Sequence, residues 1–381
     1  MGEPLYDIVI ANGTVVDPAN GVNAPGSVAL KDGRVAAVEV GIGPDEGRES
    51  IDASGCIVVP GLIDLHTHLY KDVSMFGIEA DELCPRTGVT TAVDTGTAGW
   101  INYRGLERYV IERSRTRILA YINLSGVGLP WRRGEMVYDG YVQPDMCARA
   151  VQQHPNTALG VKVRLYRGVG GDADLRDLLQ LALEAAQLCE RPLMVHITNG
   201  DVPLAELLPS LRSNDVVTHC FHGGEPAGIL DTHGKVLPEV RDARDRGVVF
   251  DIGHGLGSFS FDVCRKAIDD GFPPDTISSD VHTLNIDGPV YDLPTTMSKF
   301  LNLGMPLEEV IRRTTIEPAR VIGRADELGR LGEGAGGDVS VFEVEEGSFD
   351  LVDAEEEVLS GSRRFTCRAT VRDGEIWWRK P

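Results

Sequence analysis

Positive charge is scarce in this sequence. Its 381 residues include 37 Lys and Arg against 58 Asp and Glu, so the formal net charge is −21. Nucleic acids and anionic membranes repel such a chain, and we expect neither as a partner. No apolar run approaches the roughly 18 residues needed to cross a bilayer, so no membrane span is expected. We therefore expect a soluble protein that acts on a small molecule.

The seven cysteines are odd in number and include no C-x-x-C pair. Most lie in apolar segments, where free thiols pack as small hydrophobic side chains, so neither a disulfide framework nor a thiolate metal site is expected. Free thiols are typical of a reducing compartment. The first residues contain no basic region followed by an apolar core, which argues against a secretory signal. We expect a cytoplasmic protein.

Two common catalytic motifs are also absent. No Gly-x-Ser-x-Gly element is present, which removes the usual sign of a serine hydrolase. The glycine-rich stretches at 168–171 and 253–257 are not followed by the Lys-Ser/Thr pair of a phosphate-binding loop. We interpret both stretches as flexible loops near a substrate.

Hairpin signals stand at both ends of the chain. Short β-branched runs are separated by Asn12-Gly13, Asp32-Gly33 and Asp373-Gly374, which favour tight turns. Neither end has enough apolar residues for a core of its own. Residues 1–59 and 326–381 are therefore expected to pair into one small β-sandwich domain.

Between the two ends, predicted strands alternate with helices. Helical patterns cover residues 174–189, 204–211 and 306–322. Eight strands in such an alternation predict an α/β fold, a (β/α)8 TIM barrel over residues 60–325, rather than an open sheet. The predicted strands are Leu62–His68, Thr90–Thr95, Ile118–Leu124, Leu159–Leu165, Pro192–Ile197, Val216–Cys220, Val248–Ile252 and Thr276–Asp280.

Potential metal ligands stand on five of these strands. His66 and His68 are two positions apart in one strand, so they point to the same side. Active sites of such barrels gather at the carboxyl ends of the strands. A lone histidine at a strand end is more often structural, but the joint pattern indicates a metal site. The candidate ligands are His66, His68, Lys162, His196, His219 and Asp280.

Lys162 needs a separate explanation, because it lies in an apolar strand. Burial and nearby cations lower the pKa of a lysine and favour its neutral amine. A neutral amine can react with carbon dioxide to form a carbamate, whose two oxygens can bridge two metal ions. The alternative is a neutral lysine, or one paired with Asp280, beside a single metal.

The run Pro60-Gly61-Leu62-Ile63-Asp64-Leu65-His66-Thr67-His68, followed by a lysine on the fourth strand, two separate histidines and a late aspartate, resembles the amidohydrolase superfamily. The order is similar to that of its binuclear branch, which includes dihydroorotases, hydantoinases and related deacetylases. The resemblance covers essentially the whole chain. Residues 279–283 and 288–299 are similar to a dihydroorotase-like amidohydrolase/deacetylase subgroup, which has been linked to acetylated amino acids and hydroxy acids.

The resemblance implies a site with two divalent metal ions. His66 and His68 with Asp280 would bind one ion, the two later histidines would bind the other, and a carbamate on Lys162 would bridge them. Zinc is the expected metal, given imidazole and carboxylate ligands. A hydroxide that bridges the metals would attack a carbonyl. Asp280 would be the catalytic residue that takes its proton and returns it to the leaving group.

Four further residues are candidates for contact with substrate. Arg164 lies two positions beyond Lys162, on the same face of the strand, and is expected to hold a substrate carboxylate. A structural ion pair is the alternative for this arginine. The other candidates are Thr97 after the second strand, His254 after the seventh and His282 after the eighth.

The leading hypothesis is a metal-dependent hydrolase that cleaves the amide or ester bond of a small acylated acid, such as an N-acetyl amino acid or an O-acetyl 2-hydroxy acid. A cyclic amidase of the dihydroorotase or hydantoinase type would keep the same metals and open a ring. A mononuclear deaminase would leave Lys162 unexplained. A non-catalytic barrel that binds a ligand is disfavoured because all six ligand positions are filled. Barrels of this size commonly associate, so a homo-oligomer is compatible with the sequence.

Overall fold

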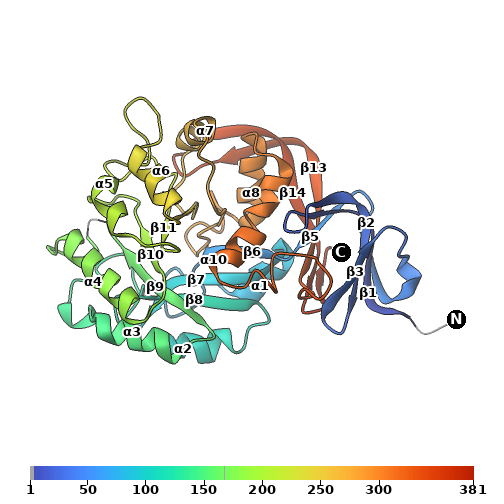
Figure 1. Ribbon diagram of the computed structural model, residues 1–381, viewed down its shortest axis with the longest axis horizontal. Coiled ribbons are helices and arrows are strands. Elements are labelled where there is room, and N and C mark those ends of the chain that lie inside the picture. The colour runs from blue at the N-terminus through green and yellow to red at the C-terminus, as the bar shows by residue number, and fades with distance from the viewer. Residues whose placement is uncertain (1–3, 167) are drawn as a thin grey trace.

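Two sheets organise the protein in the computed structural model, which describes residues 4–166 and 168–381 (Figure 1). The first is a curled sheet in which all seven strands are parallel and follow one another in chain order. Its strands are β6 (Leu62–Thr67), β7 (Val89–Gly99), β8 (Arg117–Asn123), β9 (Ala158–Arg164), β10 (Leu193–His196), β11 (Val216–Thr218) and β12 (Val249–Asp251). These correspond to the first seven predicted strands. The α/β class is therefore confirmed.

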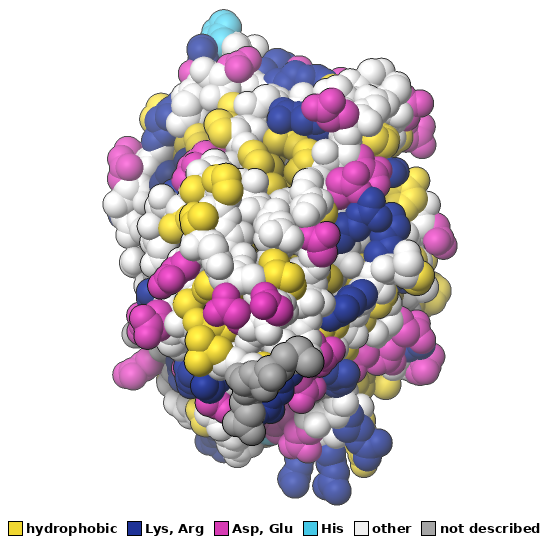
Figure 2. Space-filling view, turned by 90° about the vertical axis from the view of Figure 1, so that its right-hand side faces the viewer, with side chains coloured by type: hydrophobic (Ala, Val, Ile, Leu, Met, Phe, Trp, Pro, Cys, Tyr) yellow, Lys and Arg dark blue, Asp and Glu magenta, His cyan; other side chains and the backbone are white. Residues whose placement is uncertain are grey.

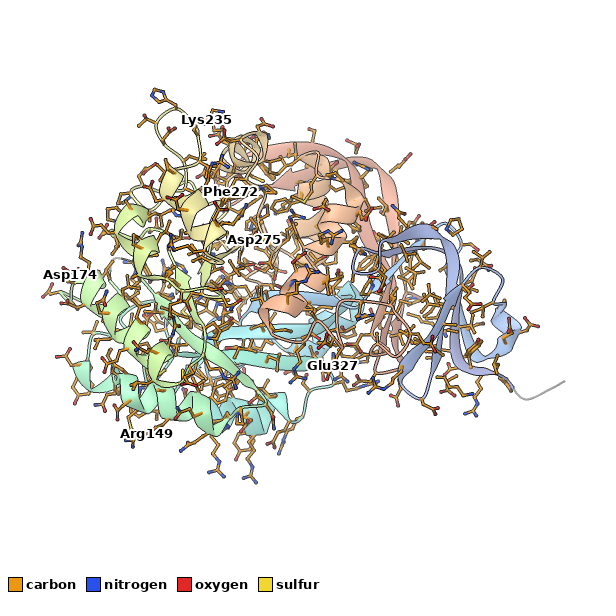
Figure 3. The ribbon with its side chains drawn as sticks, viewed as in Figure 1. Arg149, Asp174, Lys235, Phe272, Asp275 and Glu327 are labelled. Carbon is orange, nitrogen blue, oxygen red and sulfur yellow. The ribbon has the colours of Figure 1, made fainter. Side chains whose placement is uncertain are left out.

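Helices cover the outside of this sheet (Figure 1). Figure 3 shows two charged residues of this layer, Arg149 and Asp174, at the outer edge of the molecule. The helices are α1 (Ala80–Thr87), α2 (Tyr103–Leu106), α3 (Pro144–Gln153), α4 (Leu175–Leu188), α5 (Leu204–Leu207), α6 (Pro238–Asp245), α7 (Phe261–Asp269), α8 (Leu293–Asn302), α9 (Leu307–Arg312) and α10 (Ile316–Val321). No helix among the described residues has the length and apolar character needed to cross a membrane.

The three predicted helices agree with the structure to different degrees. Asp174 caps α4, because its side chain accepts a hydrogen bond from Arg176 N at 2.8 Å, so the helix begins where predicted. The pattern at 204–211 forms α5 and a 3₁₀ turn at Leu208–Ser210. The pattern at 306–322 is divided into α9 and α10, because Thr315 leaves the helical region at φ −130° and ψ −86°.

The predicted eighth strand is replaced by two isolated bridges. Thr276 forms a parallel bridge with Asp251 of β12, and Val281 forms one with Thr67 of β6. The segment 276–281 therefore lies between the two edge strands of the sheet. Its carboxyl end reaches the same end of the sheet as the other strands, as the barrel prediction requires.

Side-chain hydrogen bonds explain why this segment forms no regular ladder. Ser279 N donates to Asp64 Oδ1 at 3.0 Å, and Ser278 Oγ donates to Asp251 Oδ1 at 2.8 Å. The Asp64 carboxylate thus accepts a backbone bond that a strand residue would give to its neighbour, and the Asp251 carboxylate holds the Ser278 side chain. Asp280 has φ +50°, outside the extended region of a strand. The sequence pattern showed apolar periodicity but could not show this competition.

An eight-stranded sheet of mixed direction joins the two ends of the chain (Figure 1). β13 (Val339–Val352) pairs antiparallel with β5 (Ile57–Pro60), which lies parallel to β1 (Tyr6–Asp17). The other strands are β2 (Val22–Lys31), β3 (Arg34–Glu39), β4 (Gly47–Asp52), β14 (Val358–Arg372) and β15 (Glu375–Arg379). The predicted pairing of the two ends is confirmed. Hydrogen bonds make it one continuous sheet, where two sheets of a sandwich were predicted.

Two of the three hairpin signals are confirmed. Asp32-Gly33 joins β2 to β3, and Asp373-Gly374 joins β14 to β15. The predicted hairpin at Asn12-Gly13 is wrong, because β1 continues through it with a bulge against β2. Asn12 takes the left-handed conformation, φ +64°, that favours a tight turn but also suits a bulge. Asn12 therefore adopts the backbone conformation that its residue type favours, but pairing with β2 makes this position a bulge and not a turn.

The small sheet also packs against the curled parallel sheet. One buried cluster contains Val59 of β5 and Phe342 of β13 together with Leu62 of β6, so the two units share apolar contacts. The face shown in Figure 2 carries Lys and Arg side chains interspersed with Asp and Glu, and its hydrophobic atoms form separate small patches. The excess of negative charge is therefore not gathered on this face.

Candidate metal centre

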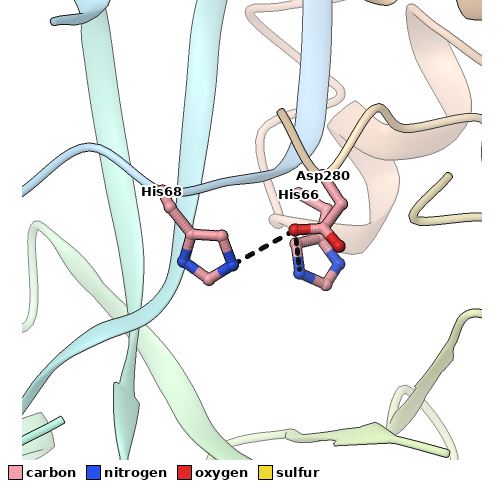
Figure 4. A group of neighbouring side chains, drawn as sticks. All are labelled: His66, His68 and Asp280. Atoms are coloured by element: carbon pink, nitrogen blue, oxygen red, sulfur yellow. Dashed lines mark ion pairs between the residues drawn. The ribbon is translucent and has the colours of Figure 1, made fainter. Parts of the chain in front are cut away.

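Three predicted ligands form a buried group at the carboxyl end of the parallel sheet (Figure 4). His66 lies in β6, His68 follows directly, and Asp280 comes from the segment 276–281. Their ligand atoms lie within 4.8 Å of one another. Asp280 Oδ1 is 3.1 Å from His68 Nε2 and 3.5 Å from His66 Nε2. The alternation of side chains explains why both imidazoles reach one carboxylate.

A chain of hydrogen bonds orients the His66 ring. Thr218 Oγ1 donates to Asp251 Oδ2 at 2.8 Å and lies 2.8 Å from His66 Nδ1. Because the hydroxyl proton of Thr218 goes to Asp251, Thr218 accepts from His66 Nδ1–H, and His66 Nε2 keeps its lone pair. This is the tautomer that a metal ligand requires. Thr218 and Asp251 were not among the predicted site residues, although both are polar residues at the ends of apolar strands.

Thr97 contacts Nδ1 of His68 in the way that Thr218 contacts Nδ1 of His66. Its Oγ1 lies 2.8 Å from His68 Nδ1, and its side chain is buried behind the ring. The structure does not bring Thr97 to the wall of the cavity, where it was predicted to contact substrate. Thr97 orients the His68 ring and leaves its Nε2 directed at Asp280.

His196 and His219 lie beside this group, at the ends of β10 and β11. Their ring centroids are 4.3 Å apart, and the His219 ring is 5.0 Å from that of His66. His219 Nδ1 donates to Gly253 O at 2.6 Å, and His196 Nε2 donates to Thr198 O at 3.2 Å. His219 Nε2 and His196 Nδ1 are therefore the nitrogens left for a metal.

Lys162 completes the cluster from β9, and its side chain is buried. Gly96, at φ +84°, makes room for it: a Cβ at position 96 would lie 2.8 Å from Lys162 Cβ and Cγ. Lys162 Nζ has no hydrogen-bond partner among the described residues. Burial lowers the pKa of Lys162, against the opposing attraction of Asp280. The neutral amine favoured here is the form that reacts with carbon dioxide.

Burial also lowers the pKa of all four imidazoles and raises that of Asp280. The histidines are therefore neutral at pH 7, which is the form in which an imidazole can bind a metal. Within residues 4–166 and 168–381, three buried atoms of this cluster have no hydrogen-bond partner: Lys162 Nζ, His219 Nε2 and Asp280 Oδ1. Each unpaired buried group costs about 1–3 kcal/mol. A cation would satisfy the nitrogen and oxygen lone pairs, so the donor set fits a divalent metal ion.

A cavity of about 240 Å³ opens over the cluster. Phe76, Leu129, Leu256 and Leu284 form the apolar part of its wall. Arg132, Arg164, Tyr166 and His282 contribute polar groups. The six candidate ligands and Thr95, Thr198, Asn199, Gly257 and Ser258 complete the lining. A cavity of this size with cationic and apolar walls suits a small anionic molecule.

Arg164 lines the cavity and also forms an ion pair. Its Nε donates to Glu135 Oε1 at 2.6 Å, and its Nη2 donates to the carbonyl oxygen of Arg132 at 3.1 Å. The two interpretations of Arg164, a substrate contact and a structural ion pair, are therefore compatible. Glu135 was not predicted, because nothing in the sequence links it to a strand 29 residues later.

Replacing Arg164 with Met is expected to raise KM for anionic substrates at least tenfold. A charged hydrogen bond to a carboxylate is worth about 1.5–3 kcal/mol, and the thioether cannot supply it. Steady-state kinetics with an acid and its uncharged amide analogue measures the effect. An equal rise in KM for both would show that Arg164 acts through packing and not through charge. Arg149→Met, on the outer face of α3, is the matched control.

The two remaining candidate histidines have different positions. His282 lines the cavity, and its Nδ1 accepts a hydrogen bond from Leu284 N at 3.1 Å, which leaves Nε2 for a ligand. Burial lowers the pKa of His282 to about 4, so the ring is neutral. His254 is not part of the cavity wall: it is fully buried, and its Nε2 lies 2.7 Å from Lys299 Nζ. The structure therefore does not place His254 where substrate would bind.

Comparison with known proteins agrees with this arrangement. A model described as the amidohydrolase family matches residues 299–377. A deacetylase of Agrobacterium fabrum is 35% identical over 346 residues, which cover 90% of this chain and 84% of that protein. A deacetylase of Enterococcus faecalis is 35% identical over 366 residues, or 95% and 94% of the two chains. The chain belongs to the amidohydrolase superfamily.

Solved structures of other amidohydrolases have the same fold. An adenine deaminase superposes with a TM-score of 0.90 at 32% identity, covering 98% of this chain and 100% of that one. A dihydroorotase superposes with a TM-score of 0.88 at 32% identity, covering 97% and 98%. These neighbours are TIM-barrel proteins, and the relatives support the dihydroorotase-like subgroup. This amidohydrolase is a hydrolytic enzyme, and its His-His-Asp group supports the use of a divalent metal.

Proposed function

We propose that this amidohydrolase uses two divalent metal ions to hydrolyse the amide or ester bond of a small acylated acid. The observation that carries the proposal is the unpartnered amine of Lys162, buried between two pairs of histidines and Asp280 at the floor of a cavity. Zinc is the proposed metal, because the donors are imidazoles and a carboxylate. A carbamate formed on Lys162 from carbon dioxide would offer one oxygen to each ion.

The bound metals would supply a nucleophilic water at neutral pH and a Lewis acid for the carbonyl. Asp280 takes the proton of the attacking water and gives it to the leaving amine or alkoxide. Burial raises the pKa of this carboxyl, which brings it closer to the range in which it can accept and return a proton. Arg164 binds the carboxylate of the substrate, and His282 contacts the carbonyl oxygen from the cavity wall.

The two deacetylases that are 35% identical to this chain support an acylated substrate. A cyclic amidase is the second candidate, supported by the dihydroorotase structure that is 32% identical over nearly the whole chain. The two reactions use the same metals and differ in whether the cleaved bond lies in a ring. Only the substrate distinguishes them.

A substrate panel with zinc-loaded protein tests the proposal. It contains N-acetyl amino acids and O-acetyl 2-hydroxy acids of both configurations, dihydroorotate, hydantoins and adenine. We expect acetate release from at least one acetylated acid with kcat/KM of about 10⁴ M⁻¹s⁻¹ or more. Ring opening without acetate release would favour the cyclic amidase, and ammonia release from adenine would favour a deaminase. Protein freed of metal by chelation is the control.

We also propose that residues 60–325 form the complete catalytic barrel, with the segment 276–281 in the position of the eighth strand. The bridges from this segment to β6 and β12 support the assignment. Residues 1–59 and 326–381 would then form the small domain, which the pairing of β5 with β13 supports.

A further inference from the structure

A second buried lysine lies near the metal centre and has no part in the reaction proposed above. Lys299, in α8, is fully buried. Its Nζ lies 2.7 Å from His254 Nε2 and donates to Pro289 O at 2.8 Å. Burial holds the pKa of His254 well below its usual value, so both contacts are to neutral groups. Asp353 and Asp292 also attract the amine, but its two hydrogen-bond partners are neutral and its burial is costly.

The contacts of His254 fix the direction of each hydrogen bond. Its Nδ1 lies 2.9 Å from Gly255 O, and a carbonyl oxygen can only accept, so Nδ1 carries the proton. In the neutral ring, Nε2 then accepts from Lys299 Nζ. The lysine has enough hydrogens for both of its contacts, whether its amine is charged or neutral. A continuous set of bonds therefore runs from Pro289 O through Lys299 and His254 to Gly255 O.

Gly255 lies directly against Asp280. At φ +56°, its backbone is so close that an added Cβ would lie 2.5 Å from Asp280 Oδ2 and 3.4 Å from Cγ. The other carboxylate oxygen, Oδ1, faces the histidine pair, 3.1 Å from His68 Nε2. Gly255 N also donates to Ser279 O at 3.0 Å. The Gly255 backbone therefore limits the rotation of the Asp280 side chain, because it packs against Oδ2, the carboxylate oxygen that faces away from His66 and His68.

The small sheet supports the same loop from the other side. β13 and β14 extend as a long hairpin that passes α8 and reaches α7 (Figure 1). At its tip, Asp353 Oδ2 accepts from Phe261 N at 2.8 Å, and Ala354 N donates to Phe259 O at 3.0 Å. The Phe259 ring packs on His254 with a centroid distance of 4.7 Å. The imidazole is thus held between α8 and an aromatic ring that the hairpin fixes.

We infer that His254 and Lys299 are positioning residues for Asp280, because they fix the Gly255 carbonyl and so the backbone against which the carboxylate packs. This inference rests on the proposed role of Asp280 as metal ligand and proton carrier. Neither side chain needs to reach the substrate. Both residues affect the rate of hydrolysis only because they fix the position of the Asp280 carboxylate.

The variants Lys299→Met and His254→Leu test the inference. Titration of the metal-free protein with Co²⁺, followed by visible absorption, reports on the carboxylate without any substrate. We expect Co²⁺ affinity to fall about tenfold in both variants, with a changed absorption band. In the zinc-loaded enzyme, kcat should fall about tenfold to a hundredfold while KM changes less than threefold, as expected for a displaced reacting group.

Two isosteric variants separate the hydrogen bond from the shape of the ring. The amide nitrogen of His254→Asn falls near the position of Nδ1 and can still donate to Gly255 O, whereas that of His254→Gln falls near Nε2 and cannot. Because His254→Asn loses the bond from Lys299 Nζ, we expect it to bind Co²⁺ more weakly than the wild type but more tightly than His254→Gln, which should behave like His254→Leu. Equal behaviour of the Asn and Gln variants would overturn the inference.

Ser298→Ala is the matched control for stability. Ser298 is the buried neighbour of Lys299 on α8, but its hydroxyl accepts from Phe365 N at 3.0 Å in β14 and does not reach the loop. The control should lower Tm and leave the Co²⁺ spectrum unchanged. If the Lys299 and His254 variants also change only Tm, the pair is structural and the inference fails. A wild type that binds Co²⁺ but hydrolyses nothing in the panel would contradict the proposed function alone.

Discussion

Replacement of Asp280 by asparagine is expected to lower kcat/KM about a thousandfold while the protein still folds and still binds metal. Asparagine keeps the shape and one oxygen ligand, but its amide cannot take a proton from water at neutral pH. General acid–base groups contribute about 10²–10⁴-fold, so the loss should be of this order. Steady-state hydrolysis of the preferred acylated acid, with metal content measured on the same sample, checks the expectation.

Asp269→Asn, an exposed change on α7, is the control for the loss of one negative charge. It should leave kcat/KM unchanged. If Asp280→Asn keeps more than a tenth of the activity with full metal, another group carries the proton. If the metal is lost as well, the experiment reports ligation and not proton transfer. Asp280→Glu then separates the two roles, because it keeps the acid and moves it by one methylene group.

Replacement of Lys162 by methionine is expected to reduce the metal content from two ions per chain to one or fewer, and the activity about a thousandfold. Methionine fills a similar volume in the strand but cannot form a carbamate. Without a shared anionic ligand, two cations at neighbouring sites repel each other in a poorly solvated place. Elemental analysis of protein loaded with zinc and bicarbonate measures the stoichiometry.

Lys266→Met is the matched control, because Lys266 pairs with Asp262 on the surface of α7. It should retain two ions. Two ions in Lys162→Met would show that the lysine is not a bridge. A single ion already in the wild type would favour the neutral or Asp280-paired lysine beside one metal. In the smaller variant Lys162→Ala, added acetate or formate should restore part of the activity, because a free carboxylate can occupy the space of the carbamate.

The residues that the sequence identified are those whose chemistry is rare and whose direction is fixed by a strand. His66 and His68 are predictable as a pair because alternation determines that both point one way. Lys162 stands out because a lysine in an apolar strand is costly. The structure brings these residues together with Asp280 because parallel strands end at one edge of the sheet.

The residues that the sequence missed act through contacts between distant segments. Glu135 reaches Arg164, and Lys299 reaches His254, across intervals that no local pattern spans. Thr97 was noticed for its position after a strand, but only the packed structure shows that its hydroxyl meets a ring nitrogen. The turn expected at Asn12-Gly13 became a bulge for a similar reason: pairing with β2 outweighed the local preference.

The position of the segment 276–281 implies that a bound metal would also stabilise the fold. The junction between β6 and this segment has no regular ladder: it is joined by the bridge at Thr67, by the bond from Asp280 N to His66 O at 2.8 Å and by the bonds from Ser279 to Asp64. The His-His-Asp group contributes side chains from both sides of this junction, so an ion bound by it would hold β6 and the segment together. The free energy of ion binding would then add to the free energy of unfolding of the protein. The supply of the ion would thus affect the stability of the folded enzyme as well as its activity.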